Sequence, residues 1–194
     1  MSGLHQSWLS NFKTYQPSRS TVTALTLAIM LGLAAVSPPA QAQTLTVLHS
    51  FKGGGDGTNP LAGLIRDGKG SLYGTSQLGG AFNYGTVFKL DATGKYTLLY
   101  TFAGSPDGAN PVAALIHDAA GTLYGTTQNG GAFNDGTVFK LDTTGKETVL
   151  HSFTGAADGK SPDAALIRDA GGNLYGTTYS GGAFGFGTVF KIAP

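Results

Sequence analysis

The sequence predicts an all-β fold made of three similar units in tandem, and two observations carry this prediction. The stretch LYGTTQNGGAFNDGTVF at residues 123–139 has near copies at residues 72–88 and 174–190, so the copies begin 51 residues apart. A repeat of this length indicates an array of like structural units. In addition, 31 of the 194 residues are glycine, among abundant threonine, valine, phenylalanine and tyrosine, which is typical of short strands joined by tight turns.

Within the middle unit, four short runs predict antiparallel strands, which we name A to D in chain order. Strands A (residues 112–117) and B (122–127) are joined by a turn with Asp118 and Gly121. Strands C (137–141) and D (147–153) are joined by a similar turn with Asp142 and Gly145. In such turns the Asp side chain accepts backbone hydrogen bonds and the glycine takes a positive φ.

Four strands in about 50 residues, recurring in tandem, are typical of a β-propeller blade. The sequence therefore predicts a β-propeller-like array of three four-stranded antiparallel blades, with repeats at 46–96, 97–147 and 148–194. Propellers usually have roughly four to eight blades. Three blades would thus form a partial ring, or a ring that is completed by oligomerisation.

The first repeat begins with TVLHSF at residues 46–51, which matches the D strands at 97–102 and 148–153, whereas the third repeat reaches only its C strand. We expect residues 46–51 to form a D strand that supplies what the last blade lacks. Two arrangements satisfy this pattern. Two chains join head to tail, each donating residues 46–51 to the other, or the chain is a truncated array that forms an open arc.

The N-terminus predicts export. Lys13 and Arg19 precede an apolar run at residues 22–36, and Ala40-Gln41-Ala42 has the small-x-small pattern of a signal-peptidase site. A bilayer span needs roughly 20 apolar residues, more than this run offers. We expect residues 1–42 to be a cleaved signal peptide and residues 43–194 to be secreted to the periplasm or outside the cell. After cleavage no stable membrane span would be left. The alternative is that the apolar run remains as an uncleaved anchor.

Charge and cysteine content exclude several classes. The net charge is +1 and the chain has no cysteine, so no disulfide can form and no lipid can attach through a cysteine. Balanced charge offers no basic stripe for nucleic acid. The sequence also has no zinc-type spacing, nucleophile elbow or phosphate-binding loop, so we expect no cofactor.

The motifs LYGTT, GGAF, DGTVFKLDTTGK and TVLHSF resemble those of the GloVer (Gloeo/Verruco) tandem repeat family, over residues 46–191. The resemblance implies an exported or surface-located bacterial repeat protein whose activity is not established. Longer members carry more repeats and various surface anchors, and this chain has three repeats and no evident C-terminal anchor.

A binding site is expected at the end of the blades that carries the long B–C and D–A loops, because binding groups tend to lie on loops held by a rigid scaffold. Aromatic and amide side chains recur there and could stack on a sugar and hydrogen-bond its hydroxyls. The alternative is that the phenylalanines fill gaps between neighbouring blades. The candidate ligand-binding residues are Phe82, Asn83, Tyr84, Phe133, Asn134, Asp135, Phe184 and Phe186.

A second set on these loops consists of Asp56, Asp107 and Asp158, each followed by Gly. Their oxygens could bind a hard cation such as calcium. However, no D-x-D-x-D-G loop is present, and Asp before Gly is ordinary turn chemistry, so we favour a structural role and no metal.

Three functions fit the sequence. The first is a non-enzymatic module that binds glycans or another surface polymer through its repeated loops. The second is a propeller lyase or hydrolase acting on polysaccharide, which would need non-equivalent acid and base groups. The single glutamate, Glu147, lies beside a C–D turn, and His49 and His151 correspond to Tyr100 in the middle repeat, so no catalytic residue is expected. The third is a structural repeat protein without a ligand.

Overall fold

The computed structural model describes residues 43–194. The predicted signal peptide and its cleavage site lie outside the described residues. Within the described residues, Val47–Pro194 forms a compact unit that contains the sheets.

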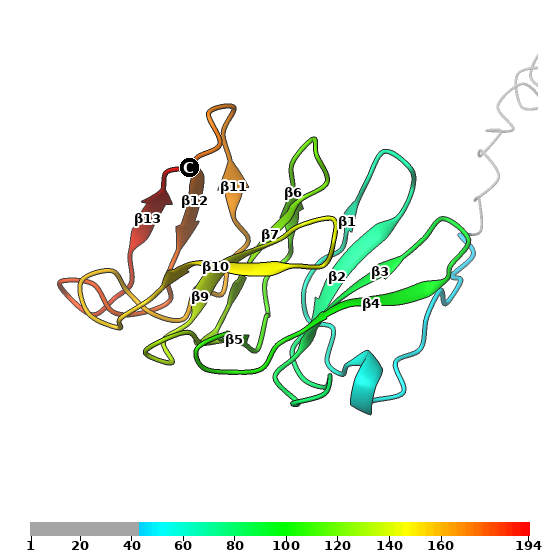
Figure 1. Ribbon diagram of the computed structural model, residues 1–194, viewed down its shortest axis with the longest axis horizontal. Helices are drawn as coiled ribbons and strands as arrows, with labels where there is room; N and C mark the ends of the chain where they lie inside the picture. The colour runs from blue at the N-terminus through cyan, green and yellow to red at the C-terminus, as the bar shows by residue number, and fades with distance from the viewer. Residues whose placement is uncertain (1–42) are drawn as a thin grey trace, which may run out of the picture. The chain divides into compact units, whose positions relative to one another are not determined.

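Three antiparallel sheets follow one another along Val47–Pro194 and together form a propeller-like array (Figure 1). Sheet 1 consists of β1 (Ile65–Arg66), β2 (Leu72–Ser76), β3 (Thr86–Leu90) and β4 (Tyr96–Thr101). Sheet 2 consists of β6 (Ile116–His117), β7 (Leu123–Thr127), β9 (Thr137–Leu141) and β10 (Glu147–Ser152). Sheet 3 consists of β11 (Ile167–Arg168), β12 (Leu174–Thr177) and β13 (Val189–Ile192). A short ribbon of β5 (Gly108–Ala109) and β8 (Asn129–Gly130), and the 3-10 turn η1 (Gly54–Asp56), lie in the long loops.

The predicted all-β class is confirmed, and sheets 1 and 2 have the expected four strands in the order A, B, C, D. Strand A is shorter than expected, because only Ile116 and His117 of residues 112–117 pair with β7. The residues before them contact the preceding sheet instead: the Ala113 carbonyl accepts a hydrogen bond from the Thr75 hydroxyl at 3.4 Å, and Leu115 is buried.

The Asp-x-x-Gly turns form as predicted. One carboxylate oxygen of Asp118 accepts hydrogen bonds from the backbone N–H groups of Ala120 and Thr122, at 2.9 and 3.0 Å. Its other oxygen accepts one from the Tyr124 hydroxyl at 3.1 Å. Gly121 takes a φ of 86°, which glycine adopts without steric cost. The turn therefore closes on itself and fixes the A–B hairpin.

The hydrophobic core lies between neighbouring sheets. The C strand β9 alternates, and both of its faces are buried, because each faces a different sheet. Phe139 and Leu141 pack with Val87 of β3 and with Phe102, which directly follows β4, whereas Val138 packs with the cluster that includes Leu166 and Leu174. The ring of Phe139 lies over Gly125 on the adjacent strand, where an added Cβ would meet the ring Cζ at 2.8 Å.

The prediction that residues 46–51 form a D strand is wrong for the structure of the single chain. These residues are not assigned to any strand, although their sequence matches β4 and β10. A strand needs a partner for its backbone groups, and β4 and β10 find theirs in β3 and β9 of their own sheets. Residues 46–51 come before the first C strand, β3, which already pairs with β4, and they have no such partner in the described chain.

Candidate functional site

The long loops of each repeat are held together by backbone pairing. The D–A loop bridges the following B–C loop through Thr58 and Leu78 in the first repeat, through β5 and β8 in the second, and through Lys160 and Ser180 in the third. A loop that is tied at its middle in this way is a rigid platform for the residues at its tip. The three loop pairs form what we call the loop rim, and it contains all the candidate residues from the sequence.

Two asparagines of the loop rim have a structural role. Asn83 and Asn134 take positive φ angles of 60° and 62°, a conformation that asparagine tolerates better than most residues. Their Oδ1 atoms accept hydrogen bonds from the backbone N–H groups of Gly79, at 2.9 Å, and Gly130, at 3.1 Å. The Oδ1 atoms thus serve the loops themselves, and the Nδ2 group of each side chain remains available to donate to a ligand.

The phenylalanines beside them point outward. Phe82 and Phe133 are each 60% exposed and Phe184 is 88% exposed. The alternative in which they fill the gaps between sheets therefore does not hold. That gap is filled by other pairs, Phe102 with Phe139 and Phe153 with Phe190, whose ring centroids are both 5.1 Å apart.

The residues two positions after Phe82 and Phe133 join neighbouring repeats through their backbone. The carbonyl oxygens of Tyr84 and Asp135 accept hydrogen bonds from the backbone N–H groups of Asn110, at 2.7 Å, and Ser161, at 2.9 Å. Tyr84 also covers Gly104, where an added Cβ would meet its ring at 2.9 Å. Phe186 occupies the same position in the third repeat, and it is exposed.

Asp56, Asp107 and Asp158 close the D–A loops. Each carboxylate accepts a hydrogen bond from the backbone N–H four residues earlier, for example Asp107 from Ala103 at 2.8 Å. Burial alone would raise the pKa of Asp158, but hydrogen bonds from Thr154 and His151 outweigh it and lower the pKa. Turn formation thus accounts for these residues. Within residues 43–194 no group of three or more His, Cys, Asp or Glu side chains is close enough to hold a metal ion.

The histidines on the D-strand segments share this structural role. His151 Nε2 lies 3.0 Å from Asp158 Oδ2, and in the second repeat the Tyr100 hydroxyl donates to Asp107 Oδ2 at the same distance. Because tyrosine and histidine make the same contact, this position does not indicate an acid or base for catalysis.

Sequence reasoning did not anticipate the environment of Glu147. This residue opens β10, and one of its carboxyl oxygens is buried without a hydrogen-bond partner. Burial, together with the nearby negative charge of Asp107, raises the pKa of Glu147 to about 7. The corresponding residue of the first repeat is Tyr96, whose hydroxyl donates to the Asp56 carbonyl at 2.7 Å. The sequence does mark this position, because its single glutamate stands where the first repeat has a tyrosine.

The repeat pattern and the sheets agree with the comparison to protein families, in which the model of the Gloeobacter/Verrucomicrobia repeat matches residues 35–194. The chain belongs to this repeat family. The Gloeobacter/Verrucomicrobia repeat thus extends through all three sheets and both long loops of each complete unit. No curated protein matches the chain at a significant level.

Among solved structures, the repeat protein is similar to virginiamycin B lyase from Staphylococcus aureus, with 15% identity and a TM-score of 0.44 over 71% of this chain and 42% of the lyase. It is also similar to a protein proposed to be a gluconolactonase, with 18% identity and a TM-score of 0.39 over 67% of this chain and 47% of that protein. The chain spans less than half the length of either structure. At these TM-scores neither likeness carries an argument about function.

In the part of the chain that the structure describes, no helix is long and apolar enough to cross a membrane.

Proposed function

We propose that this is an exported, non-enzymatic repeat protein that binds glycans or another surface polymer through its loop rim. The observation that carries the proposal is the outward position of Phe82 and Phe133, the same residue in successive repeats, on loops that are fixed by backbone pairing. Large apolar side chains normally leave the solvent during folding, so rings held outward on rigid loops are available to a ligand.

The chemistry of the rim fits a carbohydrate. An aromatic ring offers a flat apolar surface on which the C–H face of a sugar can stack. The adjacent Asn83 and Asn134 each keep an Nδ2 group that could donate to a hydroxyl, since their Oδ1 atoms already bind backbone N–H groups. In the third repeat Gly185 stands in place of the asparagine, so Phe184 would bind by stacking alone.

Repetition makes weak sites useful. Three repeats with one site each would engage successive sugars of one polymer, and linked sites gain avidity without any new contact. This favours a polymer over a small molecule as the ligand. Export is supported by the N-terminal sequence, and its test is N-terminal sequencing of the protein recovered from the periplasm or medium, which is expected to begin at Gln43.

A glycan array probed with residues 43–194 tests the binding proposal. The combined variant Phe82→Ala, Phe133→Ala and Phe184→Ala is expected to lose the binding that the unchanged protein shows, while its unfolding midpoint stays the same because exposed rings contribute little to stability.

The matched control changes Leu98→Ala and Ile167→Ala, which are exposed apolar residues on strands rather than on the loop rim. The control is expected to bind normally. Full binding by the triple phenylalanine variant, or no binding of any glycan by the unchanged protein, would remove the proposed site.

A further inference from the structure

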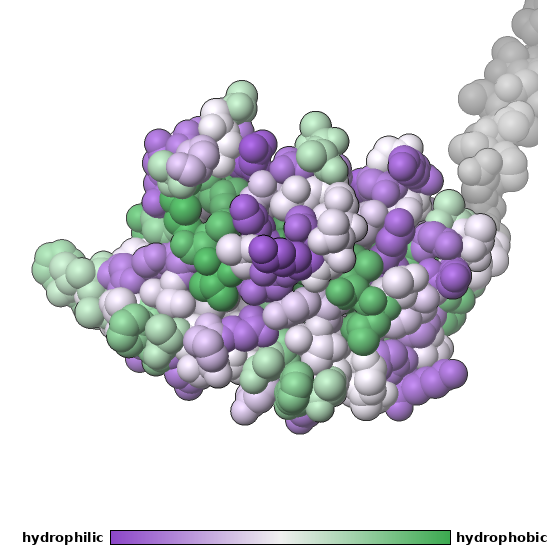
Figure 2. All heavy atoms as spheres, in the orientation of Figure 1, coloured by the Kyte–Doolittle hydropathy of each residue, from purple (hydrophilic) through white to green (hydrophobic). Residues whose placement is uncertain are grey.

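The outer edge of sheet 3 is open. Within the described residues β13 is hydrogen-bonded to β12 alone, whereas the corresponding C strands β3 and β9 each pair with a D strand as well. Val189 on this edge is 84% exposed, although its counterparts Val87 and Val138 are completely buried. Figure 2 shows hydrophobic surface in the region where β10, β12 and β13 lie. An unpaired strand with apolar side chains is a ready template for another strand.

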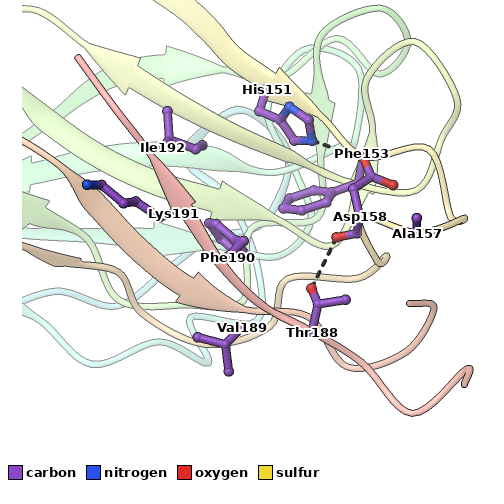
Figure 3. A pocket seen from close by; sticks show the side chains of 9 residues that line it. All are labelled: His151, Phe153, Ala157, Asp158, Thr188, Val189, Phe190, Lys191 and Ile192. Atoms are coloured by element: carbon purple, nitrogen blue, oxygen red, sulfur yellow. Dashed lines mark hydrogen bonds and ion pairs between the residues drawn. The ribbon is translucent and has the colours of Figure 1, made fainter. Parts of the chain in front are cut away.

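A cavity of about 210 Å³ lies beside this edge, lined by residues that include His151, Phe153, Asp158 and Phe190 (Figure 3). In sheet 1 the corresponding space is covered by Tyr96, the first residue of the D strand β4. The ring of Tyr96 there stacks on His49 and on Phe88, with centroids 4.4 and 5.7 Å away. The cavity is therefore the space that the first side chain of a D strand occupies elsewhere in the same molecule.

The segment at residues 45–51 lacks a C strand to pair with, whereas β13 lacks a D strand. It carries the D-strand sequence without a strand partner, and Leu45 and Val47 are 91% and 71% exposed. Its far end is nevertheless placed as a D strand would be. Phe51 packs against Phe88 with ring centroids 5.2 Å apart, as Phe102 packs against Phe139 at 5.1 Å. The segment thus occupies the D-strand position of a sheet whose other strands are missing.

The donor segment and the acceptor edge are at opposite ends of the three sheets, with the cyan segment that leads into sheet 1 far from the red β13 (Figure 1). We infer that residues 45–50 of a second copy add to β13 as its antiparallel D strand, and that the second copy receives the same segment in return. This inference concerns assembly and does not rest on the proposed glycan binding.

The repeats fix the register of this pairing. In sheet 2, Glu147 pairs with Leu141, Thr148 with Lys140 and Val149 with Phe139. When the acceptor strand is moved on by one repeat and the donor segment is moved back by two, the same register places Leu45 opposite Ile192, Thr46 opposite Lys191 and Val47 opposite Phe190. Leu45 then lies where Tyr96 and Glu147 lie, over the cavity.

Two copies joined in this way form a ring of six sheets, which lies within the usual range of about four to eight for propellers. Reciprocal exchange gives sheet 3 the fourth strand that sheets 1 and 2 already have, and closed symmetric assembly is the common form of homo-oligomers. The ring also doubles the number of exposed loop-rim phenylalanines. Strand addition of this kind obtains its affinity from main-chain hydrogen bonds and its specificity from pockets for alternate side chains.

Light scattering of both the full chain and residues 43–194 tests the inference, since Val47–Pro194 forms a compact unit of its own. Each is expected to have the mass of two chains at micromolar concentration. Thr46→Pro is expected to give a folded protein with the mass of one chain, because Thr46 would form a hydrogen-bonded pair with Lys191, as Thr148 does with Lys140, and proline removes the N–H that would join the ladder. Thr46→Ala keeps that N–H and is expected to remain a dimer.

Cross-linking tests the register. The chain has no cysteine, so a variant with Thr46→Cys and Lys191→Cys contains only the two introduced thiols. Residues directly opposite in antiparallel strands have Cα atoms about 4.5–5.5 Å apart, which suits a disulfide. Oxidation is expected to give covalent dimers. The matched control, Thr46→Cys with Lys89→Cys, is expected to give none, because Lys89 already faces Thr97 of β4.

A one-chain mass for the unchanged protein would overturn the inference. Cross-linking of residues 46 and 191 within one chain would also overturn it, because this would show closure by a single copy. A ladder of longer oligomers would overturn it as well, because this would show that two copies do not close a ring. A dimer that persists in Thr46→Pro would place the interface elsewhere and refute the proposed strand exchange.

Discussion

Replacing Glu147 with glutamine is expected to remove a loss of folding stability that occurs as the pH rises. The carboxyl group is partly buried beside Asp107, one of its oxygens has no hydrogen-bond partner, and its pKa rises from 4.5 to about 7. A raised carboxyl pKa means that the folded state holds its proton more tightly than the unfolded state. The stabilising contribution of the protonated form is therefore complete below about pH 4.5 and is lost as the pH rises through 7.

The size of the effect follows from the shift. Each pKa unit corresponds to about 1.4 kcal/mol, so the full shift would be worth roughly 3 kcal/mol. The side chain is only half buried, and solvent screening reduces this to about 1–2 kcal/mol. Glu147→Gln is expected to gain that amount over the unchanged protein at about pH 8, and to match it closely at about pH 5.

Urea unfolding of both proteins at the two pH values, at one protein concentration, measures the difference. In a protein of this size a change of about 1 kcal/mol moves the thermal midpoint by roughly 2–4 °C, so melting curves give a second reading. Glu147→Tyr restores the residue of the first repeat and is expected to stabilise at both pH values, since its hydroxyl can donate to a carbonyl as that of Tyr96 does. Parallel pH profiles for the unchanged protein and Glu147→Gln would refute the reasoning.

Two further predictions concern the sheets and turns. Gly125→Ala is expected to destabilise the fold by about 1–3 kcal/mol in urea unfolding, because the new Cβ would meet Leu115 and Phe139, both at 2.8 Å. The control Gly171→Ala, whose Cβ would have only ordinary contacts, is expected to change the unfolding midpoint little. Equal midpoints for the two variants would contradict the close packing around Gly125. The pKa of Asp169, lowered to about 2 chiefly by the hydrogen bond from the Asn173 side chain, is expected to rise in Asn173→Ala when followed by an NMR pH titration, and an unchanged titration midpoint would count against that hydrogen bond.

Much of the fold was predictable because its signals are local or periodic. The 51-residue period indicated like units, and each Asp-x-x-Gly turn closes through hydrogen bonds over at most four residues, as Asp142 does with Thr144 and Lys146. Antiparallel order within sheets 1 and 2 followed from these turns. The placement of the candidate site on the long loops also came from the order of strands alone.

The candidate side chains were harder to place, because their surroundings come from other repeats. The sequence offers Phe82 and Phe102 as equally apolar, yet packing between sheets buries Phe102 and leaves Phe82 exposed. The side-chain oxygen of Asn83 could have faced a ligand, but in a backbone conformation with positive φ it accepts a hydrogen bond from the Gly79 N–H of its own loop.

The repeat, the turn chemistry and most strand positions follow from residues that are close in the chain, and these were readable in the amino-acid sequence. Which strands find partners depends instead on packing across the whole fold. Residues 46–51 have the composition of β10, but a strand forms only where a neighbouring edge can satisfy its backbone, and that edge is supplied from outside the segment. The same holds for Glu147, whose pKa is raised by burial and by Asp107, a residue that the packing of the D–A loop brings close.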